Sequence, residues 1–364
     1  MSHVALTGAQ GFLGWHTRAA LHADQVEARG IPVGDRFNLE QAKSAIEGSE
    51  RAIHIAGVNR ASDEEVMAGN VEFAEQFAQG LRAADAAPAV VVFANSTQAD
   101  NGTVYGKAKS RAADIVAAAA SQVGAEFVDV RLPNLFGEHG KPFYNAVTAT
   151  FCHLLASGDE PTVQQDRDLT LVHAQDAADL LTGVRAVGEQ PLVEREESVS
   201  GLLARLAEIA ALYRGGEIAD VSTDFGRDLF NTYRSYAFPQ HAPIRLERHA
   251  DTRGSFFEIV RSHGGDGQSS FSTTVPGVTR GDHYHRRKIE RFTVLSGSGT
   301  IALRKLFTDE VIRFHVSGEE PAAVDMPTMW AHNITNSGSE TLYTSFWTND
   351  IFDPQNPDTI AEVV

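Results

Sequence analysis

Residues 7–14 read Thr-Gly-Ala-Gln-Gly-Phe-Leu-Gly and follow an apolar, strand-like run, His3–Thr7. In this arrangement Gly8 permits a tight turn, Gly11 lets a pyrophosphate approach the backbone, and Gly14 lets the following helix pack closely on the strand. The phosphates are expected at the N-terminus of that helix. A glycine-rich loop alone is a weak signal, because an ordinary turn has the same composition. The strand, loop and helix context favours dinucleotide binding.

The sequence beyond this loop alternates strand-like and helix-like runs. Such alternation predicts an α/β, Rossmann-like, doubly wound parallel sheet with helices on both faces. The strand-like runs are Ala52–Ile55, Ala89–Ala94 and Glu126–Arg131, and helix-like segments include Glu64–Leu81 and Ser110–Ser121.

The pattern changes around Ala237–Pro243, where two prolines mark a linker. We therefore predict two domains, residues 1–243 and residues 244–364. Short β-rich runs at close spacing predict an all-β barrel or sandwich for the second domain. These runs are Ser255–Val260, Phe271–Val275, Arg291–Leu295, Gly299–Leu306, Val311–Val316 and Thr341–Trp347.

Tyr105 and Lys109 are one helical turn apart and share a helix face. We expect the ammonium to lower the phenol pKa, so that Tyr105 acts as a general acid near neutral pH. Ser96 comes at the end of a strand, where its hydroxyl can hold a substrate carbonyl. A surface tyrosine and lysine on an ordinary helix is the alternative, and the glycine-rich loop makes it the weaker one.

Residues of the second domain have the spacing of metal ligands. His283 and His285 point to one face of a strand by period two, Glu290 follows, and His332 comes from a later strand. Three imidazoles and a carboxylate suit one divalent metal, with zinc as the first choice among Zn, Fe, Ni and Mn.

The first domain resembles the extended short-chain dehydrogenase/reductase family. Further matching stretches are His54–Gly57, Asn70, Arg131–Gly137 and Leu171–Asp176. The resemblance implies a nicotinamide cofactor, a Ser–Tyr–Lys catalytic group formed by Ser96, Tyr105 and Lys109, and a nucleotide-sugar substrate bound partly by Asn134. The residues predicted to bind the cofactor are Gly8, Gly11, Phe12, Leu13, Gly14, Arg29, Ala56, Gly57, Tyr105 and Lys109.

Arg29 decides the expected form of the cofactor. The segment Val26–Gly30 lacks an acidic residue placed to bind the ribose 2′-hydroxyl, and Arg29 could instead meet a 2′-phosphate. This favours NADPH over NADH, although Asp35 is nearby in the sequence.

The second domain resembles the cupin superfamily, and Met329 stands where the second cupin motif usually has glycine. Asp251–Glu258 and Arg280–Tyr284 also resemble the dTDP-sugar epimerases of that superfamily, which use no metal. That resemblance implies that Arg253 and Arg280 bind the nucleotide-sugar and that His283 is a catalytic base. His283 is thus either a ligand or a base, because a metal-bound nitrogen has no lone pair for a proton; His285, Glu290 and His332 are the safer ligands.

The order of the two domains resembles a family of bifunctional enzymes of capsular polysaccharide synthesis. This implies a UDP-linked 2-acetamido-2,6-dideoxy-4-ketohexose that is epimerised at C-3 and then reduced at C-4, on the pathway to UDP-N-acetyl-L-fucosamine. The main alternative is a 4-ketosugar reductase whose cupin only dimerises the chain. A dehydratase is disfavoured, because Thr97–Asp100 follows Ser96 in place of an Asp-Glu pair; a regulator without turnover would not need Tyr105 and Lys109 at helical spacing.

Composition narrows the partners. The formal charge of −17 argues against nucleic acid and anionic membrane surfaces as binding partners. The sequence contains no run of about 18 apolar residues, so we expect no transmembrane helix. Cys152 is the only cysteine, so no intrachain disulfide is possible, and together with the lack of a signal-peptide pattern this favours the cytoplasm. We expect a homodimer.

Overall fold

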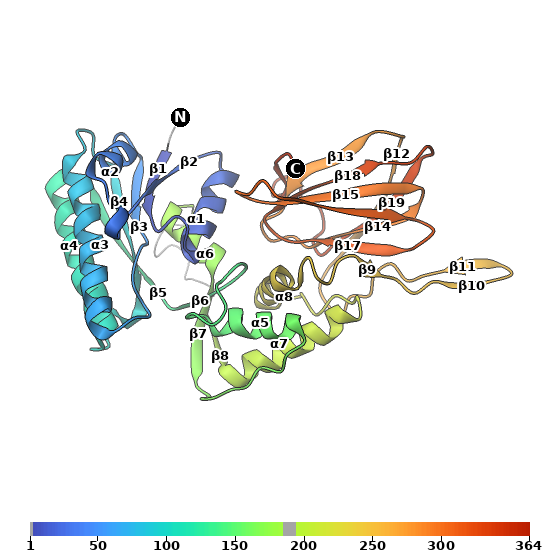
Figure 1. Cartoon of the computed structure of the whole chain (residues 1–364), viewed down its shortest axis with the longest axis horizontal. Coiled ribbons are helices and arrows are strands. Elements are labelled where there is room, and N and C mark those ends of the chain that lie inside the picture. The colour runs from blue at the N-terminus through green and yellow to red at the C-terminus, as the bar shows by residue number, and fades with distance from the viewer. Residues whose placement is uncertain (1–2, 185–193) are drawn as a thin grey trace. The chain divides into compact units, whose positions relative to one another are not determined.

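A computed structural model describes residues 3–184 and 194–364 (Figure 1). The chain divides into two units. Unit 1 contains Met1–Thr150 and Asp166–Val199, and unit 2 contains Phe151–Gln165 and Ser200–Val364. The boundary expected near residue 243 marks where helices give way to strands, whereas the contacts group the last helices with the β-rich region.

Unit 1 is built on a parallel five-stranded sheet in the order β2-β1-β3-β4-β5. The chain leaves β1 toward one edge and returns to β3 on its other side. The carboxyl ends of β1 and β3 therefore form a topological switch point, where open α/β sheets bind ligands. The strands are β1 (His3–Thr7), β2 (Glu27–Ile31), β3 (Arg51–His54), β4 (Val90–Ser96) and β5 (Glu126–Leu132).

Helices cover both faces of this sheet, as the alternating sequence predicts. The strand residues alternate between two cores: Ala5 and Val91 pack with α2, α3 and α4, while Leu6 and Val92 pack with α1 and α6. The helices are α1 (Phe12–Ala23), α2 (Leu39–Ile46), α3 (Asp63–Ala83), α4 (Val104–Val123) and α6 (Ala174–Thr182).

A second, smaller sheet of unit 1 has the order β6-β7-β8. Its strands are β6 (Asn134–Phe136), β7 (Asp168–His173) and β8 (Arg195–Ser198), and α5 (Val147–Ser157) lies between β6 and β7 in the sequence.

Unit 2 contains most of α5, then α7 (Val199–Arg214) and α8 (Asp224–Ala237), and is β-rich and antiparallel after α8 (Figure 1). Two five-stranded sheets, β12-β19-β14-β17-β9 and β16-β15-β18-β13-β20, share one apolar core. The strands are β9 (Ile244–Arg245), β12 (Gln268–Thr274), β13 (Thr279–Tyr284), β14 (Glu290–Ser296), β15 (Ser298–Lys305), β16 (Val311–Ser317), β17 (Ala322–Met326), β18 (Trp330–Asn336), β19 (Leu342–Thr348) and β20 (Ile360–Ala361).

A buried ion pair joins the helices of unit 2 to its strands. The Arg291 guanidinium donates to both carboxylate oxygens of Asp325, at 2.6 and 3.0 Å, and to the Gly216 carbonyl at 2.7 Å. Gly216 lies two residues beyond the end of α7. Because both charged side chains are almost fully buried, this pair ties that helix to β14 and β17.

A hairpin of β10 (His249–Asp251) and β11 (Gly254–Phe256) projects from the rest of unit 2 (Figure 1). Every residue of its two strands is exposed. This segment replaces the longer strand expected at Ser255–Val260.

Across the described ranges, we find no helix that combines the length and apolarity needed to cross a bilayer.

Candidate active site and metal centre

The glycine-rich loop of unit 1 has the geometry that its sequence predicts. Gly8 adopts φ +70°, and a Cβ there would lie 2.8 Å from the Ala56 nitrogen. A Cβ on Gly14 would lie 2.0 Å from the Gly8 carbonyl oxygen, so only glycine lets α1 start this close to the loop. Gly11 is the N-cap of α1, and its own amide donates to the Gly8 carbonyl at 2.9 Å.

The Thr7 hydroxyl fastens this loop to the end of β3, a role that the sequence does not predict. It accepts the backbone N–H groups of Ile55 at 3.0 Å and Ala56 at 3.1 Å. The hydroxyl donates its own proton to His54 Nδ1, at 2.9 Å. Burial, together with the charge of Lys109, lowers the pKa of His54 to about 3, so its ring is a neutral acceptor. Ala56 thus lies beside the glycine-rich loop.

Ser96, Tyr105 and Lys109 lie at the end of β4 and in the first two turns of α4. Ser96 ends β4, and its hydroxyl accepts the Gln98 N–H at 3.2 Å and is near enough to Tyr105 to act on the pKa of the phenol. A 3-10 helix, Thr97–Asp100, joins the strand to α4. Gly106 packs against it, and a Cβ at this position would lie 2.2 Å from the Gln98 carbonyl oxygen. Gly106 therefore sets how closely Tyr105 can approach Ser96.

The electrostatics of this group differ from the expectation. Lys109 is 4% exposed, its ammonium donates to the Ala94 carbonyl at 2.6 Å, and it lies 4.2 Å from the centre of the Phe93 ring. Burial lowers the pKa of Lys109 to about 8, with the Asp129 carboxylate acting in the opposite direction. Burial raises the pKa of Tyr105, and the bond to Ser96 only partly offsets this. The prediction that Lys109 lowers the phenol pKa is wrong for this arrangement, because the ammonium is bonded to β4.

Arg29 does not lie with the other residues predicted to bind the cofactor. It occupies the middle of β2, opposite Ala5, and the strand continues to Ile31. Its guanidinium donates to both carboxylate oxygens of Glu27, at 3.0 and 2.9 Å, and contacts His3. Ligands bind at the carboxyl ends of such strands, and Arg29 is two residues short of that end.

The buried carboxylate of Glu138, which follows β6 in the sequence, is a further feature that sequence analysis does not predict. Glu138 is fully buried and lies 3.1 Å from His173 at the end of β7, while its carbonyl lies 2.9 Å from the His16 ring. Burial alone would raise its pKa, but His173 beside it holds the pKa of Glu138 well below the usual range. These contacts fix the segment that begins with Asn134, whose amide donates to the Thr170 carbonyl.

The four predicted metal ligands of unit 2 converge on one point. Glu290 Oε2 lies 3.0 Å from His332 Nε2, 3.1 Å from His285 Nε2 and 3.8 Å from His283 Nε2. Their ligand atoms all lie within 4.8 Å of one another. Ligand atoms about 2.1 Å from a tetrahedral zinc ion would be about 3.4 Å apart, so the spacing suits such an ion.

Backbone carbonyls orient two of the rings toward this point. His285 Nδ1 lies 2.6 Å from the Asp358 carbonyl oxygen, and His332 Nδ1 lies 3.0 Å from the Trp330 carbonyl oxygen. A carbonyl only accepts, so each Nδ1 carries a proton, and each Nε2 is directed at Glu290. An imidazole Nε2 lone pair and the Glu290 Oε2 atom this close together repel unless a cation or a proton lies between them. The arrangement therefore fits a metal centre with oriented ligands.

The same Glu290 carboxylate carries a strongly shifted pKa. Burial acts to raise this pKa, but the three surrounding imidazoles hold it well below its usual range. The carboxylate therefore stays ionised and available to a cation. Burial also lowers the pKa of His332, which keeps that ring neutral.

A cavity of about 340 Å³ in unit 2 reaches the metal ligands from one side. His283, Glu290 and Arg280 line it, while His285 and His332 are buried behind them. Arg280 is therefore placed to meet a ligand in this cavity. Arg253 is not among the lining residues; it lies at the turn of the projecting hairpin and is paired with Asp251.

Comparison with known proteins places both units in described families. The NAD dependent epimerase/dehydratase family matches residues 4–191, and the polysaccharide biosynthesis C-terminal domain matches residues 249–360. The chain is 31% identical, over 98% of both chains, to the UDP-2-acetamido-2,6-β-L-arabino-hexul-4-ose reductase of Pseudomonas aeruginosa.

Solved structures and a shorter relative agree with this pattern. The crystal structure of the capsular polysaccharide assembling protein CapF from Staphylococcus aureus is similar over 100% of both chains, with a TM-score of 0.62 and 31% identity. The spore coat polysaccharide biosynthesis protein SpsL of Bacillus subtilis is 27% identical over 123 residues, which cover 31% of this chain and 82% of that protein.

Proposed function

Because the chain belongs to the NAD dependent epimerase/dehydratase family, we propose that it is a bifunctional enzyme acting on a UDP-linked 4-keto-6-deoxy amino sugar. Unit 2, a cupin barrel in this proposal, epimerises C-3 of a UDP-2-acetamido-2,6-dideoxy-4-ketohexose. Unit 1 then reduces the C-4 ketone to give a UDP-6-deoxy-talosamine derivative. The similar reductase and the similar capsular polysaccharide protein support this substrate class.

For the reduction, Ser96 holds the C-4 carbonyl oxygen and Tyr105 delivers a proton to it. The Ser96 hydroxyl is near enough to the phenol to act on its pKa, and in this proposal a carbonyl held by Ser96 meets both groups. Lys109, whose pKa is about 8, supplies positive charge beside the phenol once a ligand draws it from the Ala94 carbonyl. The nicotinamide, when bound, supplies the hydride to C-4.

The nicotinamide cofactor fits the groove that the glycines leave open. Gly8 and Gly14 leave no room for side chains, and the first turn of α1 has no acidic residue to repel phosphate. We favour NADPH over NADH, because β2 ends at Ile31 and is followed by Pro32 and Val33. The first carboxylate after the strand is that of Asp35, four residues later in the 3-10 helix Gly34–Arg36, so none stands directly at the strand end to bind a ribose 2′-hydroxyl.

For the epimerisation, a base removes the C-3 proton, which the neighbouring ketone acidifies, and an acid returns a proton on the other face. His283 faces the cavity and is our candidate base where it is not itself a ligand. Arg280 lines the same cavity and would bind the nucleotide-sugar. A metal held by His285, Glu290 and His332, when bound, supplies positive charge beside the enolate oxygen.

The observation that carries the bifunctional proposal is the cavity of about 340 Å³ that opens onto His283 and Glu290. A unit that only dimerised the chain would not need a cavity ending at converging imidazoles and a carboxylate. Reduction at C-4 would also remove the acidity of C-3 and so fix the new stereochemistry.

We also propose a homodimer formed through unit 2. The exposed hairpin ends in Arg253, and Phe256 on β11 is 67% exposed. A second copy would bury this apolar side chain, and Arg253 could then reach a nucleotide-sugar in the partner's cavity.

Incubation with UDP-linked 4-keto sugars in deuterium oxide tests the two steps separately. NADPH oxidation reports reduction, and mass spectrometry reports deuterium at C-3. Tyr105→Phe should lower the rate of reduction by about 100-fold or more, as expected for loss of a positioned acid, and should leave exchange intact. His332→Ala should abolish exchange and keep NADPH binding.

Each part of the proposal has its own contradicting result. Near-normal reduction by Tyr105→Phe would exclude the proposed acid. Absence of exchange in the wild-type protein would favour the reductase with a non-catalytic second unit. Normal exchange by a folded His332→Ala variant, in a protein without metal, would favour metal-free epimerisation with His283 as the base.

A further inference from the structure

The segment after β19 returns to the metal ligands and forms part of the cavity. Asp350, Ile351, Phe352, Asp353, Asn356 and Pro357 line one side of it. A few residues later, β20 pairs with β13, where Ala361 lies opposite His283. One short stretch of chain therefore contacts both the cavity and a strand that carries a ligand.

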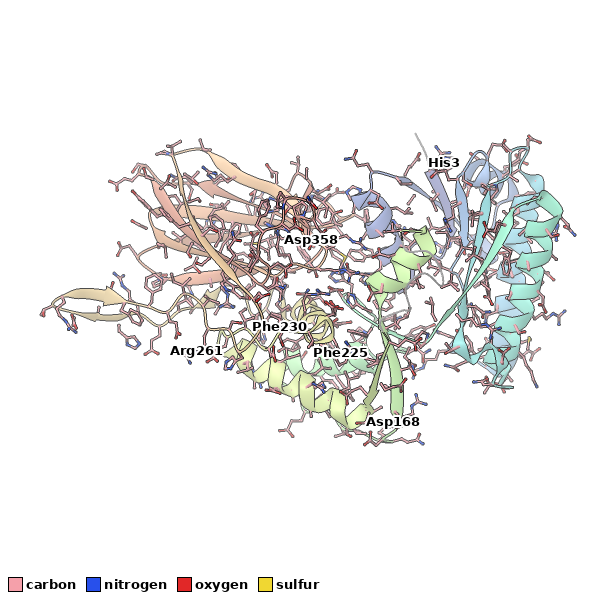
Figure 2. The ribbon with its side chains drawn as sticks, turned by 180° about the vertical axis from the view of Figure 1, so that it is seen from behind. His3, Asp168, Phe225, Phe230, Arg261 and Asp358 are labelled. Carbon is pink, nitrogen blue, oxygen red and sulfur yellow. The ribbon has the colours of Figure 1, made fainter. Side chains whose placement is uncertain are left out.

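Asp358, labelled in Figure 2, binds the turn that follows His285. Its Oδ1 accepts the backbone N–H of Arg286 at 2.9 Å. Its Oδ2 accepts the backbone N–H groups of Arg287 at 2.8 Å and Lys288 at 2.7 Å. These bonds fix the backbone directly after the ligand.

The backbone of Asp358 acts on the ligand itself. Its carbonyl oxygen lies 2.6 Å from His285 Nδ1. The corresponding partner of His332 is the Trp330 carbonyl, only two residues away on the same strand. The orientation of His332 is therefore local, whereas that of His285 depends on a residue 73 positions later.

A second set of bonds holds this segment in place. The Lys288 ammonium donates to the Pro357 carbonyl at 2.8 Å and to the Thr359 hydroxyl at 3.0 Å. Asp358 adopts φ +40°, a left-handed conformation that costs free energy for a residue other than glycine. The surrounding bonds offset this cost and keep the carbonyl directed at His285.

We propose that Asp358 is a positioning residue for the metal ligand His285. Its carboxylate fixes the turn after the ligand, and its carbonyl holds the ring so that Nε2 faces Glu290. This inference rests on the proposed metal site. It adds that the affinity of the site depends on a residue that is not a ligand.

Zinc affinity of the full chain, measured by competition with a chelator, tests the inference. Asp358→Asn keeps the size of the side chain but replaces one carboxylate oxygen by an NH₂ donor, which cannot accept the backbone N–H groups that follow His285. It should weaken zinc binding about 10- to 100-fold, the usual effect of losing a group that orients a ligand. The matched control is Asp353→Asn, since the Asp353 carboxylate accepts the Gln355 N–H and Asp353 is not one of the converging metal ligands of the described chain. The cobalt-substituted protein should also show a changed visible spectrum in Asp358→Asn alone.

The outcomes separate this inference from the proposed function. A wild-type protein that binds no zinc would overturn the metal site and the inference with it. Zinc binding that is equal in wild type and a folded Asp358→Asn would overturn the inference alone. If Asp358→Asn does not fold, Lys288→Met decides, because it removes only the second set of bonds. Its zinc affinity should fall by about threefold or more, and an unchanged affinity would refute the role of the segment.

Discussion

Alanine should destabilise the protein far more at Gly14 than at Gly11, two glycines of the same loop. A Cβ on Gly11 would lie 3.3 Å from the Gly8 carbonyl oxygen, which needs a shift of only a few tenths of an ångström. A Cβ on Gly14 would lie 2.0 Å from the same oxygen. Non-bonded heavy atoms sit about 3.5 Å apart, so the backbone at Gly14 would have to move by more than about 1 Å.

These distances set the expected free energies of unfolding. Gly11→Ala exchanges one N-cap residue for a poorer one, which should cost less than about 1 kcal/mol. Gly14→Ala forces α1 away from the loop and should cost about 3 kcal/mol or more, at the upper end of overpacking penalties. Urea denaturation of both variants measures the two values.

Gly11→Ala, although it should change stability little, should weaken binding of the cofactor. Its methyl group would stand at the N-terminus of α1, where we place the pyrophosphate. NADPH should therefore bind at least about 10-fold more weakly, a loss of about 1.4 kcal/mol, although the protein remains folded. Fluorescence titration of NADPH provides the measurement. A stable Gly11→Ala variant with wild-type NADPH affinity would refute the placement of the pyrophosphate at this helix.

Three further predictions concern charged groups. The folded-state pKa of Lys109 is about 8, so the ammonium is lost as pH rises through that value; kcat for NADPH oxidation should fall there, and Lys109→Met should be slow without that pH dependence. Arg29→Ala should change NADPH and NADH affinity by the same factor, because its guanidinium binds Glu27; a loss selective for NADPH in binding titrations would contradict this. Asp325→Ala should lower the free energy of unfolding by about 3–5 kcal/mol, because it leaves the buried charge of Arg291 unpaired. Urea denaturation measures this value, with the exposed Asp309→Ala as the control; an Asp325→Ala variant as stable as wild type would refute the prediction.

Local patterns predict most of the two candidate sites. The glycine spacing of residues 7–14 fixes the loop because each requirement involves neighbours within one turn. Period two predicts that His283 and His285 share a face, and the structure brings both together with Glu290, the first residue of the next strand, and with His332. In each site the interacting residues are either close together in the sequence or belong to a motif whose full spacing identifies the site.

What the sequence could not supply depends on partners far along the chain. The sequence Val26–Gly30 leaves the end of this strand undefined, and only the pairing of β2 with β1 shows that Arg29 falls short of the strand end. The direction of the Lys109 ammonium depends on a carbonyl of β4, whereas helical spacing predicts only that it shares a face with Tyr105. Asp358 carries no spacing signal at all, because its partners lie about 70 residues earlier.

The long separation between His285 and Asp358 also has a consequence for biosynthesis. The ribosome needs several seconds to advance the 73 positions from His285 to Asp358, at about 5–20 residues per second. During that interval His283, His285 and Glu290 leave the ribosome before the residue that orients His285 has been added. The proposed metal centre is therefore completed only after nearly all of unit 2 has been translated. A chain stalled before Asp358 would carry the ligands without the carbonyl that directs His285.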